Sequence, residues 1–179
     1  NGINTFKTEN GRTVFDGGGV TPDVKIKVSK RTDATKKLIQ SKAIFNFATD
    51  YFFKNPKIEN VENYHFSASD FSDFVDYLKV DTTFVTKPEK LFKTAFLSVG
   101  NNSISKEYNQ IKDRLLKDKV NEISKNKDIL TVLLEDEVLK KYYYKEGVYK
   151  HHLKNDTTIS EAVNLLKNED KYKQILSGK

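Results

Sequence analysis

The pattern of hydrophobic and polar positions changes character near residue 31. Before it, short β-like runs, such as residues 13–15 and the strictly alternating residues 24–28, lie between glycines. After it, apolar residues recur with the period of amphipathic helices. The sequence therefore predicts a mainly α fold, with a helical domain over residues 31–179 and a β-hairpin and strand segment over residues 1–30. Because two or three strands are only marginally stable alone, we expect this segment to pair with a sheet elsewhere.

Capping and breaking residues predict where most of the helices begin and end. Thr86 to Glu89 and Thr158 to Glu161 have the spacing of capping boxes, and Ser67 or Ser69 can cap the helix that follows them. Gly147 is predicted to break a helix, and residues 100–103 mark a sub-boundary within the helical domain. The predicted helices run from Asp33 to about Lys54, over residues 71–78, from Lys87 to Val99, over residues 104–124, from Lys127 to Lys145, over residues 158–166 and around residues 172–176. For the helix after Thr86, we expect Leu91, Phe92, Ala95, Phe96 and Val99 on the apolar side.

Charge and composition exclude several classes of protein. The chain has 179 residues, with 31 Lys and Arg against 25 Asp and Glu, which gives a net charge of +6. The two signs alternate along the sequence instead of forming a basic stripe, so we expect no nucleic-acid partner. The absence of cysteine excludes disulfides, thiolate zinc sites and cysteine catalysis. No apolar run reaches the roughly 18–20 residues that a transmembrane helix needs, so we expect no transmembrane segment.

The histidines do not have the spacing of a metal site. His151 and His152 are adjacent, so on a helix they point about 100° apart, whereas a zinc pair on one helical face needs i, i+4 spacing. Asp156 is available only from a loop. We therefore expect a solvated helix end at this point, no metal and no cofactor.

Two further clusters have structural interpretations. Glu135, Asp136 and Glu137 fan around a helix within pairing distance of Lys140 and Lys141, which indicates a solvated, ion-paired face rather than acid–base chemistry. Three consecutive tyrosines occupy residues 142–144. Because one or two of any three successive residues on a helix must face inward, we expect core packing here, with the exposed tyrosine as a candidate interface residue.

The most specific string runs from Asn10 to Asp23 and reads N-G-R-T-V-F-D-G-G-G-V-T-P-D. It resembles the segment that closes the protease core in carboxyl-terminal processing (tail-specific) serine proteases, in the form found in Bacteroidetes. The matching residues are Gly11, Arg12, Gly17, Gly18, Gly19, Pro22 and Asp23. Apart from the resemblance, glycines permit positive φ, Pro22 fixes its own φ, and Asp23 can accept backbone N–H groups in a turn. The motif is thus either a turn entering an edge strand or a wall of a peptide-binding groove.

The resemblance implies where catalysis takes place. Proteases of this family use a Ser/Lys dyad, in which a buried lysine with a lowered pKa serves as the base for the serine. Both residues precede the Gly-Arg…Pro-Asp segment, so we assign no catalytic residue within residues 1–179 and expect the chain alone to be inactive. The string Ser67-Ala68-Ser69-Asp70 superficially resembles the sequence around the nucleophile. Because it follows the motif and directly precedes an apolar helical pattern, we expect it to be a helix cap.

These observations lead to one main function and two alternatives. We expect a non-catalytic C-terminal domain of a tail-specific serine endopeptidase in the bacterial periplasm. Its expected partners are the upstream protease core of the same polypeptide, unstructured protein substrates and a second copy in a homodimer. The first alternative is a free-standing secreted helical module that binds a protein or the cell wall. The second is a hydrolase with an unrecognised site, which would show turnover by the isolated chain.

Overall fold

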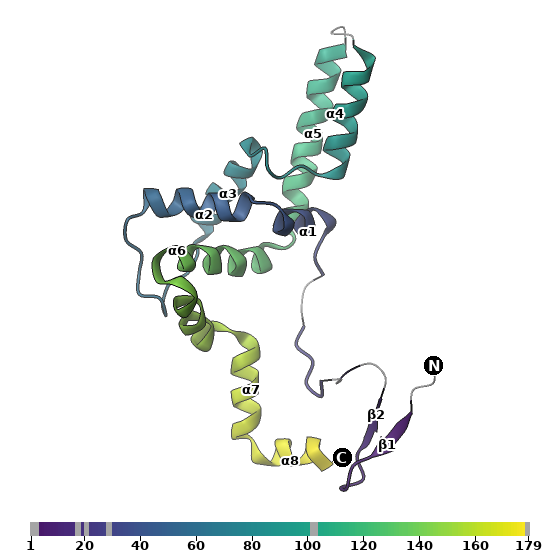
Figure 1. Cartoon of the computed structure of the whole chain (residues 1–179), viewed down its shortest axis with the longest axis vertical. Helices are drawn as coiled ribbons and strands as arrows, with labels where there is room; N and C mark the ends of the chain where they lie inside the picture. Colours follow the sequence, from purple (N-terminus) through teal and green to yellow (C-terminus); the bar gives the residue numbers. More distant parts are fainter. Residues whose placement is uncertain (1–3, 17–18, 20–21, 28–29, 101–103, 178–179) are drawn as a thin grey trace. The chain divides into compact units, whose positions relative to one another are not determined.

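The computed structural model describes residues 4–16, 19, 22–27, 30–100 and 104–177. They form two compact units, one of residues 29–151 and one of residues 1–28 together with residues 152–179. Over these residues the fold is mainly α with one short hairpin, as the sequence predicts (Figure 1). The elements are β1 (Thr5–Lys7), β2 (Thr13–Phe15), α1 (Asp33–Gln40), α2 (Ala43–Lys54), α3 (Ala68–Val80), α4 (Lys87–Val99), α5 (Ser105–Ser124), α6 (Lys127–Asn155), α7 (Thr157–Lys167) and α8 (Glu169–Ser177).

The predicted hairpin is confirmed, with β1 and β2 antiparallel and Phe6 opposite Val14. Gly11 makes the turn possible, because its φ of +79° is one that glycine adopts without strain. The strand predicted over residues 24–28 is wrong for the described residues 24–27, which have no strand structure. Alternation alone does not form a strand, since a strand needs a partner. In the described sheet β1 and β2 pair only with each other.

An aromatic core holds together the unit of residues 29–151. The ring of Phe47 in α2 packs edge-on against Phe74 of α3, with centroids 5.1 Å apart, and against Phe66 at 6.1 Å. Helix α6 supplies aliphatic side chains to the same core, and Leu130 and Leu134 are fully buried. Burial of this kind stabilises each such side chain by about 1.5–3 kcal/mol relative to exposure.

The single helix predicted from Asp33 to Lys54 is two helices, α1 and α2. Ser41 separates them, because its N–H and hydroxyl both donate to the Leu38 carbonyl and its hydroxyl also accepts from Ala43 N at 3.2 Å. These side-chain bonds offer the backbone an alternative to the helix. The N-cap of α1 is Thr32, whose hydroxyl accepts from Thr35 N at 3.1 Å, so Asp33 is the first helical residue and not the cap. The predicted end at Lys54 is confirmed, with Asn55 as the C-cap.

Helix α6 is kinked at Tyr144 and not at Gly147, where the sequence predicts a break. Tyr144 has φ 57° and ψ −162°, and the chain continues in helical form on both sides of it. Gly147 lies within the helix and is buried. A Cβ atom at this position would lie 2.2 Å from Cβ of Tyr143. Glycine is therefore needed for the close approach of two turns beside the kink rather than for ending the helix.

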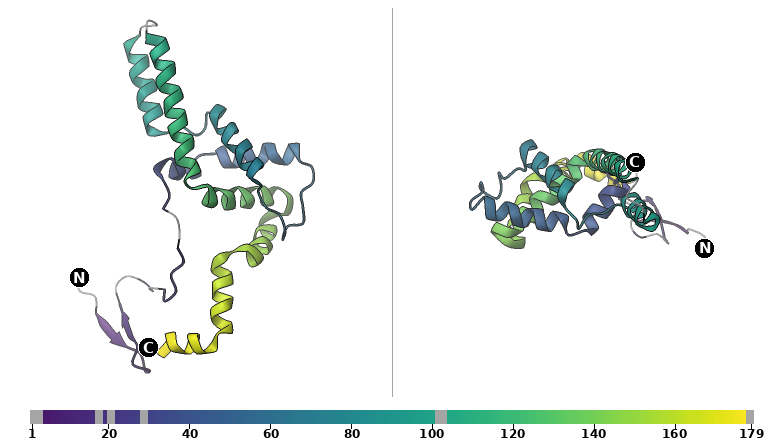
Figure 2. Two further views of the ribbon diagram at one scale, coloured as in Figure 1. Left: turned by 180° about the vertical axis from the view of Figure 1, so that it is seen from behind. Right: turned by 90° about the horizontal axis from the view of Figure 1, so that it is seen from above.

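Helices α4 and α5 form a two-helix arm that extends away from α1, α2, α3 and α6 (Figure 2). The capping box of Thr86 and Glu89 is confirmed at its start, and Gly100 ends α4 with a φ of +64°. The aromatic rings of Phe92 and Phe96 stack on Tyr108 of α5, with centroids 5.1 and 3.9 Å away. The predicted apolar side faces α5 through these rings, but no residue of α4 is buried: Leu91 is 59% exposed and Val99 57% exposed.

Helices α7 and α8 end the chain. The N-cap of α7 is Asp156, whose carboxylate accepts from Thr158 N at 2.6 Å and from Ile159 N at 3.2 Å. The capping box predicted at Thr158 is therefore wrong, because the helix has already begun at Thr157. Within the described ranges, no helix combines the length and apolar character needed to cross a bilayer.

Candidate functional site

The motif between Asn10 and Asp23 is held by an ion pair between its two ends. The guanidinium of Arg12 donates to the carboxylate of Asp23, eleven residues further along the chain. Gly11 and Gly19 both have positive φ, at +79° and +82°, which agrees with the conformational reason for glycine in the motif. Pro22 is exposed, and Gly17 and Gly18 lie outside the described residues. The structure thus brings together Arg12 and Asp23 of the motif, whose functional role stays a prediction.

A second link fixes the base of the hairpin. Asp16 accepts from the side chain of Asn4 at 2.9 Å and from its backbone N–H at 2.8 Å. Both hydrogen bonds lower the pKa of Asp16 below its ordinary value, and the one from the Asn4 side chain has the larger effect. Residues 1–28 contain neither serine nor histidine, so this segment has no nucleophile–base pair of the Ser/His type.

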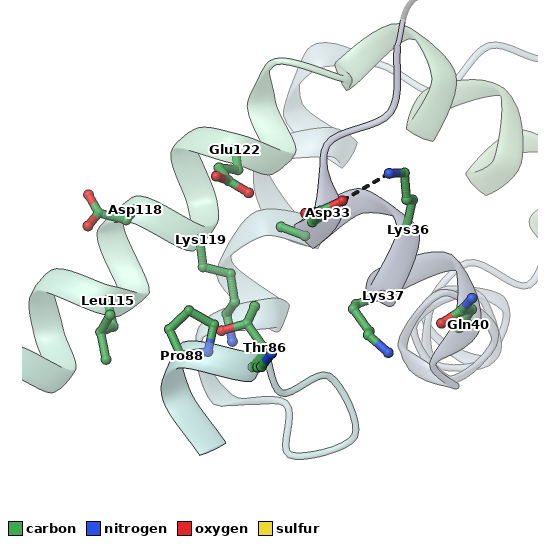
Figure 3. Close-up of a pocket in the computed structure, with 12 residues that line it drawn as sticks. Asp33, Lys36, Lys37, Gln40, Thr86, Pro88, Leu115, Asp118, Lys119 and Glu122 are labelled. Atoms are coloured by element: carbon green, nitrogen blue, oxygen red, sulfur yellow. Dashed lines mark hydrogen bonds and ion pairs between the residues drawn. The ribbon is translucent and has the colours of Figure 1, made fainter. Parts of the chain in front are cut away.

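A cleft of about 680 Å³ opens in the helical unit between α1, the start of α4 and α5 (Figure 3). Lys36 and Lys37 of α1 lie on one wall. Asp118 and Glu122 of α5 lie on the wall that faces them, and Pro88 contributes from α4. The cleft therefore presents both signs of charge beside exposed apolar surface. Such a lining is suited to contacting a polypeptide of varied sequence and has no geometry that singles out one small molecule.

Lys119 lies beside this cleft and is the most buried cation of the helical unit, with a side chain 4% exposed. Its Nζ donates to Oε1 of Glu89 at 2.8 Å and to the carbonyl of Phe84 at 3.2 Å, and lies 4.8 Å from the centroid of the Phe84 ring. Burial raises the pKa of Glu89, but hydrogen bonds from Lys119 and Thr86 outweigh it and leave the pKa below its ordinary value. This lysine therefore joins α5 to the cap of α4, and its ammonium group donates to groups that hold the fold together.

A second buried polar group centres on Glu135, which the sequence predicts to be solvated. Its Oε1 accepts from Phe66 N at 2.9 Å and its Oε2 lies 3.6 Å from Nε2 of His151. Nδ1 of His65 lies 3.9 Å from Oε1, and Nδ1 of His151 lies 3.0 Å from the Val61 carbonyl. The carboxylate thus ties the loop before α3 to the two parts of α6.

The solvated helix end predicted for His151 is also wrong, because His151 is 3% exposed. Helix α6 continues past Gly147, and the kink at Tyr144 carries Val148 and His151 onto the core side. The continuing spacing of Val148 and His151 was the signal available in the sequence. His152 is half-buried, with Nδ1 3.6 Å from Oδ2 of Asp156. Across the described part of the chain, no three His, Cys, Asp or Glu residues are arranged to hold a metal ion.

The resemblance of Ser67-Ala68-Ser69-Asp70 to a nucleophile sequence is resolved as a helix cap. The Ser67 hydroxyl accepts from Asp70 N at 3.1 Å, and the Asp70 carboxylate accepts from Ser67 N at 2.8 Å. This reciprocal pair is a capping box, as the local sequence predicts.

The tyrosines and the acidic cluster of α6 follow the predicted pattern in part. The Tyr142 hydroxyl donates to the Asn55 carbonyl, whereas Tyr144 is 80% exposed. Glu137 pairs with Lys140 at 3.0 Å, as expected, but Lys141 lies over the Phe45 ring.

Helices packed around an aromatic core, preceded in the sequence by an exposed hairpin, define a helical domain. Residues 34–166, from α1 to nearly the end of α7, match the family described as "Probable PDZ-protease, C-terminal helical domain". The chain belongs to this family. It is thus the C-terminal helical domain of a probable PDZ-protease. No curated protein matches the chain. No solved structure matches it either.

Proposed function

We propose that the chain is the non-catalytic C-terminal domain of a tail-specific serine endopeptidase that degrades or trims proteins from their C-terminal tails. In this account the Ser/Lys dyad belongs to the protease core, upstream of Gly11 and Arg12, and the enzyme works in the bacterial periplasm. Membership of the helical-domain family supports the C-terminal position. The motif from Asn10 to Asp23 supports the tail-specific class, because it resembles the end of that class of protease core.

The observation that carries the proposal is the exposed hairpin. Phe6 is 53% exposed and Phe15 is 64% exposed, and neither strand contains a buried residue. Two strands of three residues are marginal in water, and their unpaired edges are ready to accept a further strand. We infer that the hairpin completes the sheet of the protease core and that its phenylalanines become buried there.

The Arg12–Asp23 ion pair constrains the position of Asp23, after β2, relative to the hairpin. It joins Arg12, next to the hairpin turn, to Asp23, eight residues after β2 ends. An arginine guanidinium is suited to holding a carboxylate in a fixed orientation. The pair would present Arg12 and Asp23 to the core in one arrangement.

The mixed-charge cleft of Figure 3 is the surface to which we assign a role in handling substrate. An unstructured polypeptide offers side chains of both signs, and Lys37 can meet its carboxylates while Asp118 and Glu122 meet its ammonium groups. Lys36 already donates to Asp33 at 2.9 Å. We propose that this cleft contacts the unfolded substrate. Contacts between exposed charges are weak individually, so the cleft would favour varied sequences over one motif.

The hairpin proposal is tested in the intact protease with Phe15→Asp. A charge placed on a face that is buried against the core is costly, so the cleavage rate of an unfolded protein should fall roughly tenfold or more. Phe53→Asp is the matched control, because Phe53 is 77% exposed in α2, and it should leave the rate unchanged. Equal rates for both variants would overturn the docking of the hairpin.

A further inference from the structure

The arm of α4 and α5 carries an apolar groove whose side chains remain open to solvent. The groove has a volume of about 270 Å³ and lies between Ala95 and Val99 of α4 and Ile104 and Ile111 on the α5 side. Ile111 is 45% exposed and Ile104 is 38% exposed, and the neighbouring Leu91 is 59% exposed. Adjacent exposed apolar side chains of this size mark an interaction surface.

The charges beside the groove are arranged so that two copies of this face can pair with each other. Glu107 lines the groove, and Arg114 follows it seven residues later. Seven residues are about two helical turns, so both side chains share one face of α5 with Ile111 between them and lie about 10 Å apart along the axis. Within the described ranges, neither Glu107 nor Arg114 forms an ion pair or a side-chain hydrogen bond.

We propose that this face binds the same face of a second copy of the chain, with the two α5 helices antiparallel. A two-fold axis beside Gln110 and Ile111 places Glu107 of each copy opposite Arg114 of the other. The arrangement is isologous, because one patch meets itself and each charge pair occurs twice. The groove residues of both arms then form the inside of a four-helix assembly, with the ion pairs at its margin.

The charge of the face favours a second copy over a lipid surface. Helix α4 has 13 residues and is therefore about 20 Å long, so each arm offers a two-helix face of between three and four turns. An anionic membrane attracts Lys and Arg only, whereas this face presents Glu107 as well as Arg114. The opposite charges would set the register of the two helices, and apolar burial would supply most of the affinity. This inference does not depend on the protease assignment.

The test is sedimentation equilibrium of the whole chain, residues 1–179, and of charge variants. The unaltered chain should dimerise. Glu107→Arg and Arg114→Glu each place like charges opposite one another, so each should raise the dimer Kd about tenfold or more. The double variant E107R/R114E restores both pairs with reversed polarity and should dimerise again. An equimolar mixture of the two single variants should form a heterodimer, since each supplies the charge that the other lacks.

Glu161→Arg is the matched control, because it makes the same charge change on the exposed surface of α7 and should leave the Kd unaltered. Circular dichroism checks that each variant retains its helices. The proposal is overturned if the unaltered chain is monomeric at all concentrations, including the case in which it binds anionic vesicles instead. It is also overturned if the single variants dimerise as well as the unaltered chain, because the interface would then lie elsewhere.

Discussion

The ammonium nitrogen of Lys119 lies 2.8 Å from Oε1 of Glu89, which joins α5 to the first turn of α4. The side chains are 4% and 20% exposed, so solvent screens the pair only weakly. Replacing Lys119 with Met removes the donor to Oε1 of Glu89 and to the Phe84 carbonyl, while Thr86 still donates to Oε2 of Glu89. We expect a loss of about 3 kcal/mol in the free energy of unfolding, measured by urea denaturation. Lys117→Met, at an exposed position of α5, should change it by less than about 0.5 kcal/mol.

The same pair predicts how stability depends on pH. Because the pKa of Glu89 is lowered on folding from its ordinary value of 4.5, its contribution is fully present above pH 4.5. It is lost as the pH falls through the lower folded value. Glu89→Gln should therefore destabilise the chain at pH 7, and the difference from the unaltered chain should shrink as the pH falls below 4.5. A difference that stays constant over this range would contradict the assigned ionisation.

Replacing Gly147 even with alanine should lower the stability of the protein. In most helices Gly→Ala is stabilising by about 0.5–1 kcal/mol. Here the new Cβ would meet Cβ of Tyr143 at 2.2 Å, so we expect a loss of about 1–3 kcal/mol instead. Thermal unfolding gives the sign directly, and a raised Tm for Gly147→Ala would show that the kink at Tyr144 is not closely packed.

Glu135 and Glu137 provide a paired comparison on one helix. Glu135→Ala removes the acceptor of Phe66 N and the carboxylate beside His151, so it should lower the free energy of unfolding by about 2–3 kcal/mol. Glu137→Ala removes only an i, i+3 pair with Lys140 and should cost less than about 0.5 kcal/mol. Chemical denaturation measures the free energy of unfolding of both variants, and an equal decrease in the two would contradict the structural role of Glu135.

Local rules in the sequence predicted the hairpin and several helix boundaries, because their causes are local. Ser67 and Thr86 cap helices through residues three positions away, and Asn55 ends α2 through its own backbone. The features that failed depend on contacts distant in sequence. His151 is buried because α6 kinks at Tyr144 and approaches Val61, ninety residues earlier.

The exposure of the arm and the ion pair of the motif also depend on contacts that local sequence rules do not describe. The apolar period of α4 was correct, but packing against α5 leaves Leu91 and Val99 exposed. The Arg12–Asp23 pair could not be derived from spacing, since eleven residues with several glycines allow many closures. The buried Lys119 was missed because lysine is almost always at the surface unless it is paired.

The most direct test of the account compares cleavage of one unfolded protein by the intact protease and by residues 1–179 alone. The account predicts that the intact enzyme shortens the substrate from its C-terminal tail and that residues 1–179 release no fragments at equal concentration. Fragments produced by residues 1–179 would contradict the non-catalytic assignment. An intact protein that leaves unfolded substrates uncut would contradict the tail-specific endopeptidase assignment.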